Sequence, residues 1–391
     1  MTTGPDARTH AAREDNPVHM IDADHITPPP WPRQAALQMA LSRTRQLLGR
    51  RKKPFMADDR LRRPDWLAAA VQQRSPVCVP ALAALTQTLN EASKAPDAKD
   101  GHCLVMLPPC DDSALLTRWA ADRGHACLCP PAHDALLTRE EVSITLPPGD
   151  GILVIPDLAA WCLRHQHGLR HIRALLEQLA ARKARRCVIG CNSWTWSFLC
   201  RAVQADLMLP PPLTLSPLEE VPLRHWFAEV AHDSVPVERR FRLSGSGRDL
   251  LALNAGERPG HDYFKQLAAR SLGIPWVAWH LWQRSLRERI EPDDKDDRNT
   301  LWVVALEEIS LPGGGQTEYL LILHALLIHG ALPHETLEQV LPDMTIRPLL
   351  HALEANGYIA CHNGWYHCQP GAYPAIRRGL EAAGFPMDLY G

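Results

Sequence analysis

Residues 103–116 read Cys103-Leu104-Val105-Met106-Leu107-Pro108-Pro109-Cys110-Asp111-Asp112-Ser113-Ala114-Leu115-Leu116. The apolar run that opens this stretch does not alternate with polar residues, which is typical of a strand covered on both faces. A helix is expected over 113–123, and its apolar pair Leu115-Leu116 stands where such a helix packs on a sheet. The stretch therefore predicts a strand, a turn and a helix at the start of an α/β domain.

The same alternation continues along the chain. Short strands are predicted over 126–129, 151–155, 187–190 and 213–215. Between them, Leu169, Ile172, Leu176 and Leu179 recur at helical spacing. Strands that alternate with helices predict an α/β fold with a mostly parallel sheet and helices on both faces. We place this domain at residues 101–218.

The turn at 108–114 has the position of a phosphate-binding loop without its chemistry. Such a loop needs glycines to wrap the phosphates, a lysine to neutralise them and a hydroxyl to hold Mg²⁺. Here no glycine opens the loop, Ser113 stands where the lysine would be, and Ala114 replaces the hydroxyl. Asp111 and Asp112 would repel phosphates. We therefore interpret Cys110, Asp111, Asp112 and Ser113 as a vestigial nucleotide site.

The order of these segments resembles the AAA+ and STAND branch of P-loop ATPases over about residues 100–390. Residues 151–157 resemble the strand that carries the Mg²⁺-directing aspartate, here Asp157, but Leu158 stands where the catalytic acid is expected. Residues 187–193 resemble the next strand, which ends in a polar sensor, here Asn192 or Ser193. The resemblance implies a helical lid over 219–298, including a charged linker at 291–298, with Arg284 as a second sensor.

A narrower resemblance is to an uncharacterised bacterial group of ATPase-like proteins, carried by residues 164–169 and 191–196. That group implies no activity. Asp157, Asn192 and Arg284 also have a structural interpretation, as a strand-end cap, a turn residue and a surface arginine. Because the phosphate loop is degenerate, we favour the structural interpretation.

The C-terminal segment, residues 299–391, has the pattern of a winged helix. Helices are predicted over 318–330 and 333–340, and a third begins after Thr345 with Ile346, Leu349, Leu350 and Leu353 on one face. Asn363-Gly364 is a strong hairpin signal between strands at 358–362 and 365–369. A two-residue turn pairs His362 with Trp365, Cys361 with Tyr366 and Ile359 with Cys368. The nearby cysteines and histidines then lie on opposite faces, so no zinc site is expected.

The charge of this segment favours protein partners over DNA. Residues 316–391 hold three Lys/Arg and seven Asp/Glu, whereas phosphate neutralisation supplies most non-specific DNA affinity. Arg347 is the one basic residue of the third helix. We predict a protein-contact surface that includes Arg347, His351 and Trp365.

The N-terminal part offers a different surface. Residues 1–32 are predicted to be a disordered leader, and 33–100 a helical segment with a basic cluster. The cluster comprises Arg43, Arg45, Arg50, Arg51, Lys52 and Lys53. It suits an anionic partner such as lipid, nucleic acid or an acidic protein, but we favour a solvated helix end and linker.

Bulk composition sets the class of protein. A chain of 391 residues predicts two or three domains, and a net charge of −2 gives no whole-molecule attraction to nucleic acid. No run approaches the about 18 apolar residues that span a bilayer. The eleven irregularly spaced cysteines indicate a reducing compartment, so a cytoplasmic location is expected.

These features predict a non-catalytic regulatory or adaptor protein that requires no cofactor. Its partners would be proteins, such as an active ATPase paralogue or further copies of itself. One alternative is an NTPase with an unusual loop, which would bind ATP and Mg²⁺ through Asp157, Asn192 and Arg284. A second alternative is a DNA-binding regulator that relies on the basic cluster.

Overall fold

The computed structural model describes residues 18–32, 55–65, 74–94, 101–140, 142–149, 151–181, 186–233, 239–251, 263–292, 295–307, 311 and 317–390. The chain divides into two compact units. Unit 1 comprises Met1–Thr27, Val79–Ser216 and Ile309–Gly391, and unit 2 comprises Pro28–Cys78 and Pro217–Glu308. The basic cluster, Arg43 to Lys53, lies outside the described residues.

Unit 1 is built on a six-stranded sheet with the order β1-β7-β3-β6-β5-β4. Its strands are β1 (Met20–Asp22), β3 (Cys103–Leu107), β4 (Ala126–Cys127), β5 (Leu153–Ile155), β6 (Cys187–Asn192) and β7 (Leu213–Leu215). Every neighbouring pair from β7 to β4 is parallel, and only β1 is antiparallel. The prediction of a mixed α/β fold with a mostly parallel sheet is confirmed.

The strand β1 differs from the predicted disordered leader. Met20–Asp22 pairs with Leu213–Leu215, and the amide of Ala23 donates to the carbonyl of Pro212 at 3.0 Å. An open sheet edge offers backbone donors and acceptors to any extended segment, so this pairing needs little apolar sequence. The prediction of disorder rested on composition, and composition does not show that an open sheet edge is available for pairing.

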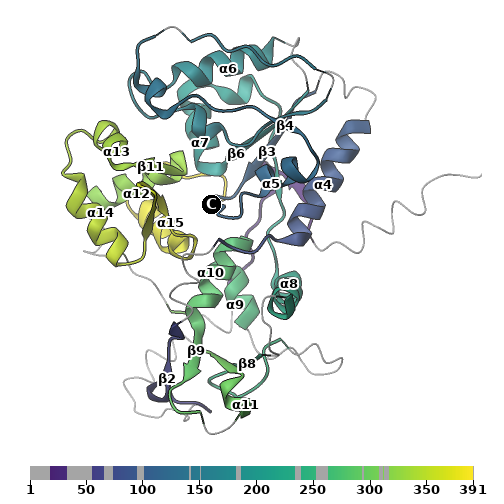
Figure 1. The fold of residues 1–391 in the computed structure, drawn as a ribbon, viewed down its shortest axis with the longest axis vertical. Coiled ribbons are helices and arrows are strands. Elements are labelled where there is room, and N and C mark those ends of the chain that lie inside the picture. Colours follow the sequence, from purple (N-terminus) through teal and green to yellow (C-terminus); the bar gives the residue numbers. More distant parts are fainter. Residues whose placement is uncertain are drawn as a thin grey trace, which may run out of the picture. The chain divides into compact units, whose positions relative to one another are not determined.

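Helices pack against the sheet from both sides (Figure 1). They are α4 (Val79–Lys94), α5 (Leu115–Asp122), α6 (Arg170–Ala180) and α7 (Ser193–Val203), with short 3-10 turns at η1 (Ala23–His25), η3 (His133–Leu137), η4 (Leu158–Trp161) and η5 (Ala205–Leu207). The strands β3 and β5 are buried throughout. At Gly190 on β6 a Cβ would lie 2.0 Å from the carbonyl oxygen of Pro156, so only glycine allows this approach.

The C-terminal elements of unit 1 form a helical layer with a small antiparallel sheet of order β11-β13-β12. They are α12 (Thr317–His329), β11 (Ala331–Pro333), α13 (His334–Val340), α14 (Ile346–Ala355), β12 (Ile359–His362), β13 (Trp365–Cys368), η7 (Pro370–Ala372) and α15 (Tyr373–Ala382). The hairpin has the predicted register in all three predicted pairs. Both turn residues have positive φ, 51° at Asn363 and 83° at Gly364, as a tight hairpin requires. The strand β11 and the helix α15 were not predicted.

Unit 2 contains a sheet as well as the helices that the sequence predicted for residues 219–298. It contains α8 (Glu220–Asp233), α9 (Tyr263–Arg270), α10 (Pro275–Ser285) and α11 (Lys295–Arg298), with η2 (Asp58–Arg60). It also contains a four-stranded sheet, β2 (Leu61–Arg62), β9 (Leu286–Arg289), β10 (Thr300–Val303) and β8 (Arg240–Leu243), in that order. The strand β10 was predicted to belong to the C-terminal domain, and β2 to an N-terminal helical segment. Both join this sheet through pairing between distant segments, which local periodicity cannot show.

The tryptophans of unit 2 pack in its interior. Trp276 and Trp282 are buried, and the Trp282 ring lies 4.9 Å from that of Phe227. These aromatic side chains therefore form part of the core of unit 2. Among the described residues, no helix combines the length and apolar character needed to cross a bilayer.

Candidate functional site at the carboxyl edge of the sheet

In open α/β sheets, ligands bind outside the carboxyl ends of the strands. The loop with Cys110, Asp111, Asp112 and Ser113 follows β3, Asp157 follows β5, and Asn192 ends β6. Because β6 lies between β3 and β5, the structure brings these predicted residues to one edge. The seventh predicted residue, Arg284, belongs to unit 2, where it is half-buried in the last turn of α10.

The loop after β3 places a carboxylate inside its own turn. Asp111 accepts hydrogen bonds from the amides of Ser113, at 3.0 Å, and Leu115, at 2.9 Å. The Ser113 hydroxyl also donates to it, at 2.6 Å. Burial raises the pKa of Asp111, and these hydrogen bonds oppose the rise. Backbone amides at the start of a helix are the groups that cradle a phosphate, so Asp111 occupies donors that an anion would use.

The same loop has a backbone that favours glycine. Cys110 and Ala114 have φ of 62° and 51°, in the left-handed region that side chains with a Cβ disfavour. Burial also raises the pKa of the Cys110 thiol well above its ordinary value. A thiol that stays protonated is a weak nucleophile.

Asp157 and Asn192 both cap the elements that follow them. The Asp157 carboxylate accepts from the amide of Ala159 at 2.9 Å, and Asn192 accepts from the amides of Trp194 and Thr195 at 3.0 and 2.9 Å. The Asn192 amide group donates to the Thr195 hydroxyl at 2.6 Å. Burial raises the pKa of Asp157 to about 6. Asp157 and Asn192 therefore have the geometry expected of residues with structural roles, Asp157 as a cap at the end of a strand and Asn192 as a turn residue.

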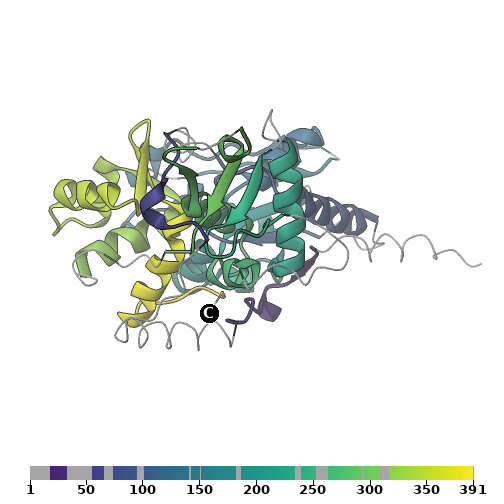
Figure 2. The same cartoon turned by 90° about the horizontal axis from the view of Figure 1, so that it is seen from below.

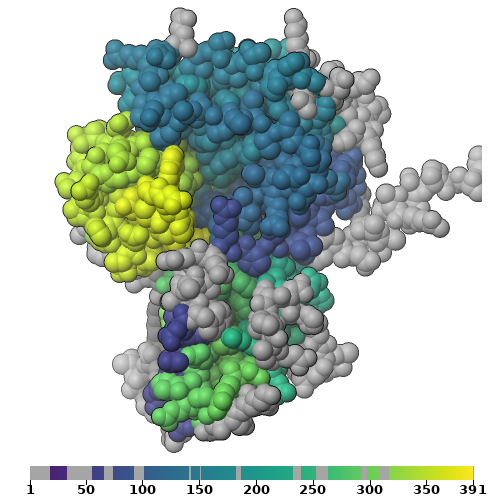
Figure 3. All heavy atoms as spheres, viewed as in Figure 1, coloured from purple at the N-terminus to yellow at the C-terminus, as the bar shows by residue number. Residues whose placement is uncertain are grey.

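The C-terminal elements lie against the same edge of the sheet. In both cartoon views they lie on the opposite flank of unit 1 from α4 (Figures 1 and 2). On the face drawn in Figure 3, their yellow-green atoms abut the blue atoms of the α/β elements. Three hydrogen bonds start from residues that follow β4, β5 and β6: His133 with Thr336 at 2.8 Å, the Arg164 amide with His329 at 3.2 Å, and Thr195 with the Ile328 carbonyl. A fourth joins Thr214, within β7, to Tyr390 at 3.1 Å.

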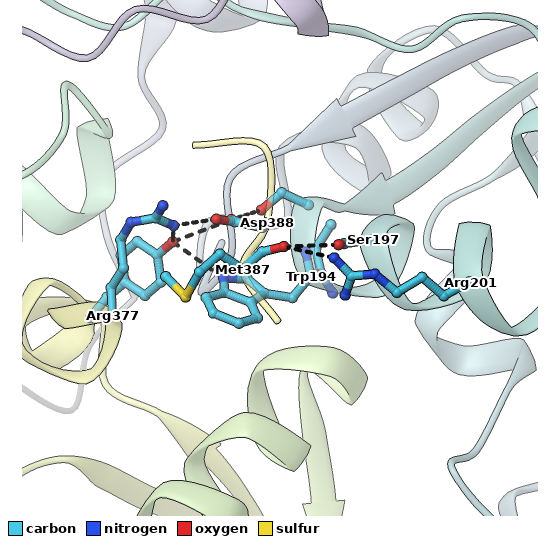
Figure 4. Close-up of polar contacts among 9 residues, drawn as sticks. Trp194, Ser197, Arg201, Arg377, Met387 and Asp388 are labelled. Carbon is cyan, nitrogen blue, oxygen red and sulfur yellow. Dashed lines mark hydrogen bonds and ion pairs between the residues drawn. The ribbon is translucent and has the colours of Figure 1, made fainter. Parts of the chain in front are cut away.

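A buried polar network joins the chain's last residues to the start of α7 (Figure 4). Asp388 forms an ion pair with Arg377 of α15 and accepts from the Ser193 hydroxyl at 2.5 Å. The Tyr373 hydroxyl donates to Asp388 at 3.4 Å and accepts from the Trp194 indole at 3.2 Å. The Asp388 side chain has no exposed surface, and that of Arg377 is 7% exposed. The network therefore joins residues 387–390 and α15 to the start of α7 with almost no exposure to solvent.

Sequence reasoning missed this network. Asp388 counted only as one of seven acidic residues, and Arg377 as one of three basic ones. The available signal was the apolar character of Met387, Leu389 and Tyr390 around one acid, which is more typical of a buried than of a solvated segment. Nothing local indicates that Ser193, distant in sequence, would be its partner.

The residues of the predicted protein-contact surface are all exposed in the structure. Arg347 and His351 are exposed on α14. Trp365 is also exposed, at 39%, and its ring packs edge-to-face on that of His133 at 5.1 Å.

Compared with models of known protein families and with curated proteins, the sequence matches none of them.

Proposed function

We propose that this protein is a non-catalytic regulatory or adaptor protein, in which a degenerate P-loop ATPase-like domain and a winged-helix-like domain present surfaces to other proteins. The observation that carries the proposal is the state of the carboxyl edge. Asp111 already accepts hydrogen bonds from amides that would bind a phosphate. Asp157 and Asn192 accept from amides of the elements that follow them, and the C-terminal elements pack beside this edge. A site whose donors are already satisfied gains little by binding a nucleotide.

The order of the elements supports both parts of the proposed architecture. The sensor-like strand β6 lies between β3, with its degenerate loop, and β5, which leads to Asp157. This order is compatible with a P-loop ATPase-like core. In the C-terminal domain, helix, strand, two helices and a hairpin follow one another, which is compatible with a winged helix.

The proposed partner is a protein, either an ATPase paralogue or another copy of this chain, in the cytoplasm. Because Arg347 and His351 are exposed on α14, this helix is the first surface to test. Its mixed charge suits a protein better than a nucleic acid. No metal or nucleotide is required for this role.

Titration of the purified chain with labelled ATP and Mg²⁺ tests the loss of nucleotide binding. We expect no saturable binding at millimolar ATP. Saturable binding that is lost in Asp157→Ala would instead favour the ATP-binding alternative. DNA binding with a steep salt dependence, reduced by neutralising Arg50 to Lys53, would favour a DNA-binding regulator.

The partner surface is tested by comparing light scattering and affinity capture for the wild type and Arg347→Glu. A partner or self-association that is lost in this variant supports the proposal. The control is Arg173→Glu, since Arg173 is also exposed on a helix of unit 1 but belongs to α6. Equal loss in both variants would contradict a specific surface on α14.

A further inference from the structure

A cavity of about 250 Å³ opens between α7, α12 and the chain's last residues. It lies beside the buried network, and Trp194 takes part in both. Its volume is slightly below the range of about 300–1,000 Å³ that is typical of sites for drug-sized molecules. The occupant that fits is therefore a small molecule rather than a peptide.

Both charged residues that line the cavity are cations, Arg164 and Arg201, and no carboxylate is among its described lining residues. The nearby Asp388 carboxylate is paired with Arg377. Neither arginine forms an ion pair with a described carboxylate, in contrast to Arg377, which is paired with Asp388. The Arg201 guanidinium instead reaches the carbonyl of Met387, at 3.4 Å (Figure 4). Two guanidinium groups beside an apolar cavity favour an anionic group in the occupant.

The walls of the cavity are aromatic. Trp194, Phe198 and His324 line it, and the His324 ring meets that of Trp194 edge-to-face at 5.6 Å. Burial lowers the pKa of His324 to about 4, with a further lowering from Arg164 and Arg201. At neutral pH this histidine is therefore an uncharged ring. Aromatic walls favour a flat apolar body in the occupant.

We propose that this cavity binds a small aromatic anion, with its carboxylate or phosphate group between Arg164 and Arg201 and its ring against Trp194 and Phe198. The inference goes beyond the proposed adaptor role and does not depend on it. An occupant would contact α7, α12 and the tail together, so binding would stabilise the C-terminal domain on the sheet. The protein would then respond to a metabolite through the packing of these elements.

The experiment uses the full chain and three probes: phenyl phosphate, benzoate and the neutral comparator benzamide. Calorimetry is combined with the fluorescence of the wild type and of Arg201→Gln. Arg201 is exposed, so the variant is expected to fold, which a thermal melt checks. Arg173→Gln is the matched control, because it removes the same charge from an exposed site on α6.

We expect one of the two anions to bind saturably, to raise the melting temperature, and to bind about tenfold more weakly to Arg201→Gln. Arg173→Gln should bind like the wild type, and benzamide should bind at least about tenfold more weakly than the matching anion. The proposal is overturned if neither anion binds at millimolar concentration. It is equally overturned if benzamide binds as well as the anions, or if the two variants weaken binding alike.

Discussion

The loop after β3 and residues 387–390 each hold a carboxylate by several hydrogen bonds, half-buried at Asp111 and fully buried at Asp388, but the partners differ. Asp111 is held by amides and a hydroxyl two to four residues away in its own turn. Asp388 is held by Arg377 of the preceding helix and by Ser193, 195 residues away. The first arrangement is a local turn that forms with the loop. The second exists only when the C-terminal domain has packed on the sheet, so its loss should affect the whole of unit 1.

The largest expected effect is at Asp388. Asp388→Ala leaves the buried guanidinium of Arg377 unpaired and removes the acceptor of two hydroxyls, so the free energy of unfolding should fall by about 3–5 kcal/mol. Urea denaturation measures it. Asp343→Ala, which removes an exposed acid from the same domain, should change stability by less than about 0.5 kcal/mol. Similar losses in the two variants would show that the network is not an important link.

The next effect has the opposite sign and concerns Asp157. Burial raises the pKa of its carboxylate from 3.8 to about 6, and no cation among the described residues offsets that rise. Between pH 3.8 and about 6, Asp157 is protonated in the folded state but ionised in the unfolded state. The stability that comes from this difference in protonation is lost as pH rises through about 6. Asp157→Asn should keep the cap and raise the free energy of unfolding at pH 7 by up to about 3 kcal/mol.

The pH dependence separates this effect from other titrations. The advantage of Asp157→Asn over the wild type should be full above pH 6 and should vanish near pH 4. Buried His324 and His329, with pKa values lowered to about 4 and about 3, act in the opposite direction. They remove stability as pH falls below about 6.5, where the unfolded histidines gain protons. Because both proteins contain them, they cancel in the difference, and a constant difference across this range would contradict the assignment.

A smaller effect is expected at Asp111. Asp111→Ala removes the acceptor for the amides at the start of α5, which should cost about 1–2 kcal/mol, as for the loss of a helix cap. Thermal denaturation of this variant is compared with that of Asp122→Ala, an exposed acid at the other end of α5. If the comparison with the tail is right, Asp111→Ala is clearly milder than Asp388→Ala. A loss as large as that of Asp388→Ala would show that the loop is not a local unit.

The smallest effect tests the backbone of the same loop. Ala114 has a left-handed φ of 51°, so Ala114→Gly should relieve strain and stabilise the protein by about 0.5–1 kcal/mol. The same substitution at Ala120, inside α5, should destabilise by about 1 kcal/mol. Chemical denaturation measures the change in the free energy of unfolding for each variant. A loss of stability in both variants would contradict backbone strain at Ala114.

The sequence by itself determined the features that depend on neighbouring residues. The unbroken apolar runs of β3 and β5 predicted buried parallel strands, because a strand covered on both faces tolerates no polar side chain. Asn363-Gly364 determined the register of the hairpin, because few residue pairs adopt two positive φ angles. The acids of the loop at 108–114 predicted a carboxylate at the start of a helix, and Asp111 accepts hydrogen bonds from the amides of Ser113 and Leu115 there.

Only the tertiary structure decided the features that join distant segments. β1 and β2 are short segments whose pairing is provided by the open edges of β7 and β9, and no periodicity in so few residues reveals an edge elsewhere. Asp388 and Arg377 look like surface charges in the sequence, and they are buried because the folded chain brings Ser193 and Tyr373 to them. The cavity beside them has the same origin, since Arg164, Arg201 and His324 come from three separate segments. Burial and charge pairing between residues so far apart in sequence depend on tertiary packing, so the residues near each one in the sequence do not predict them.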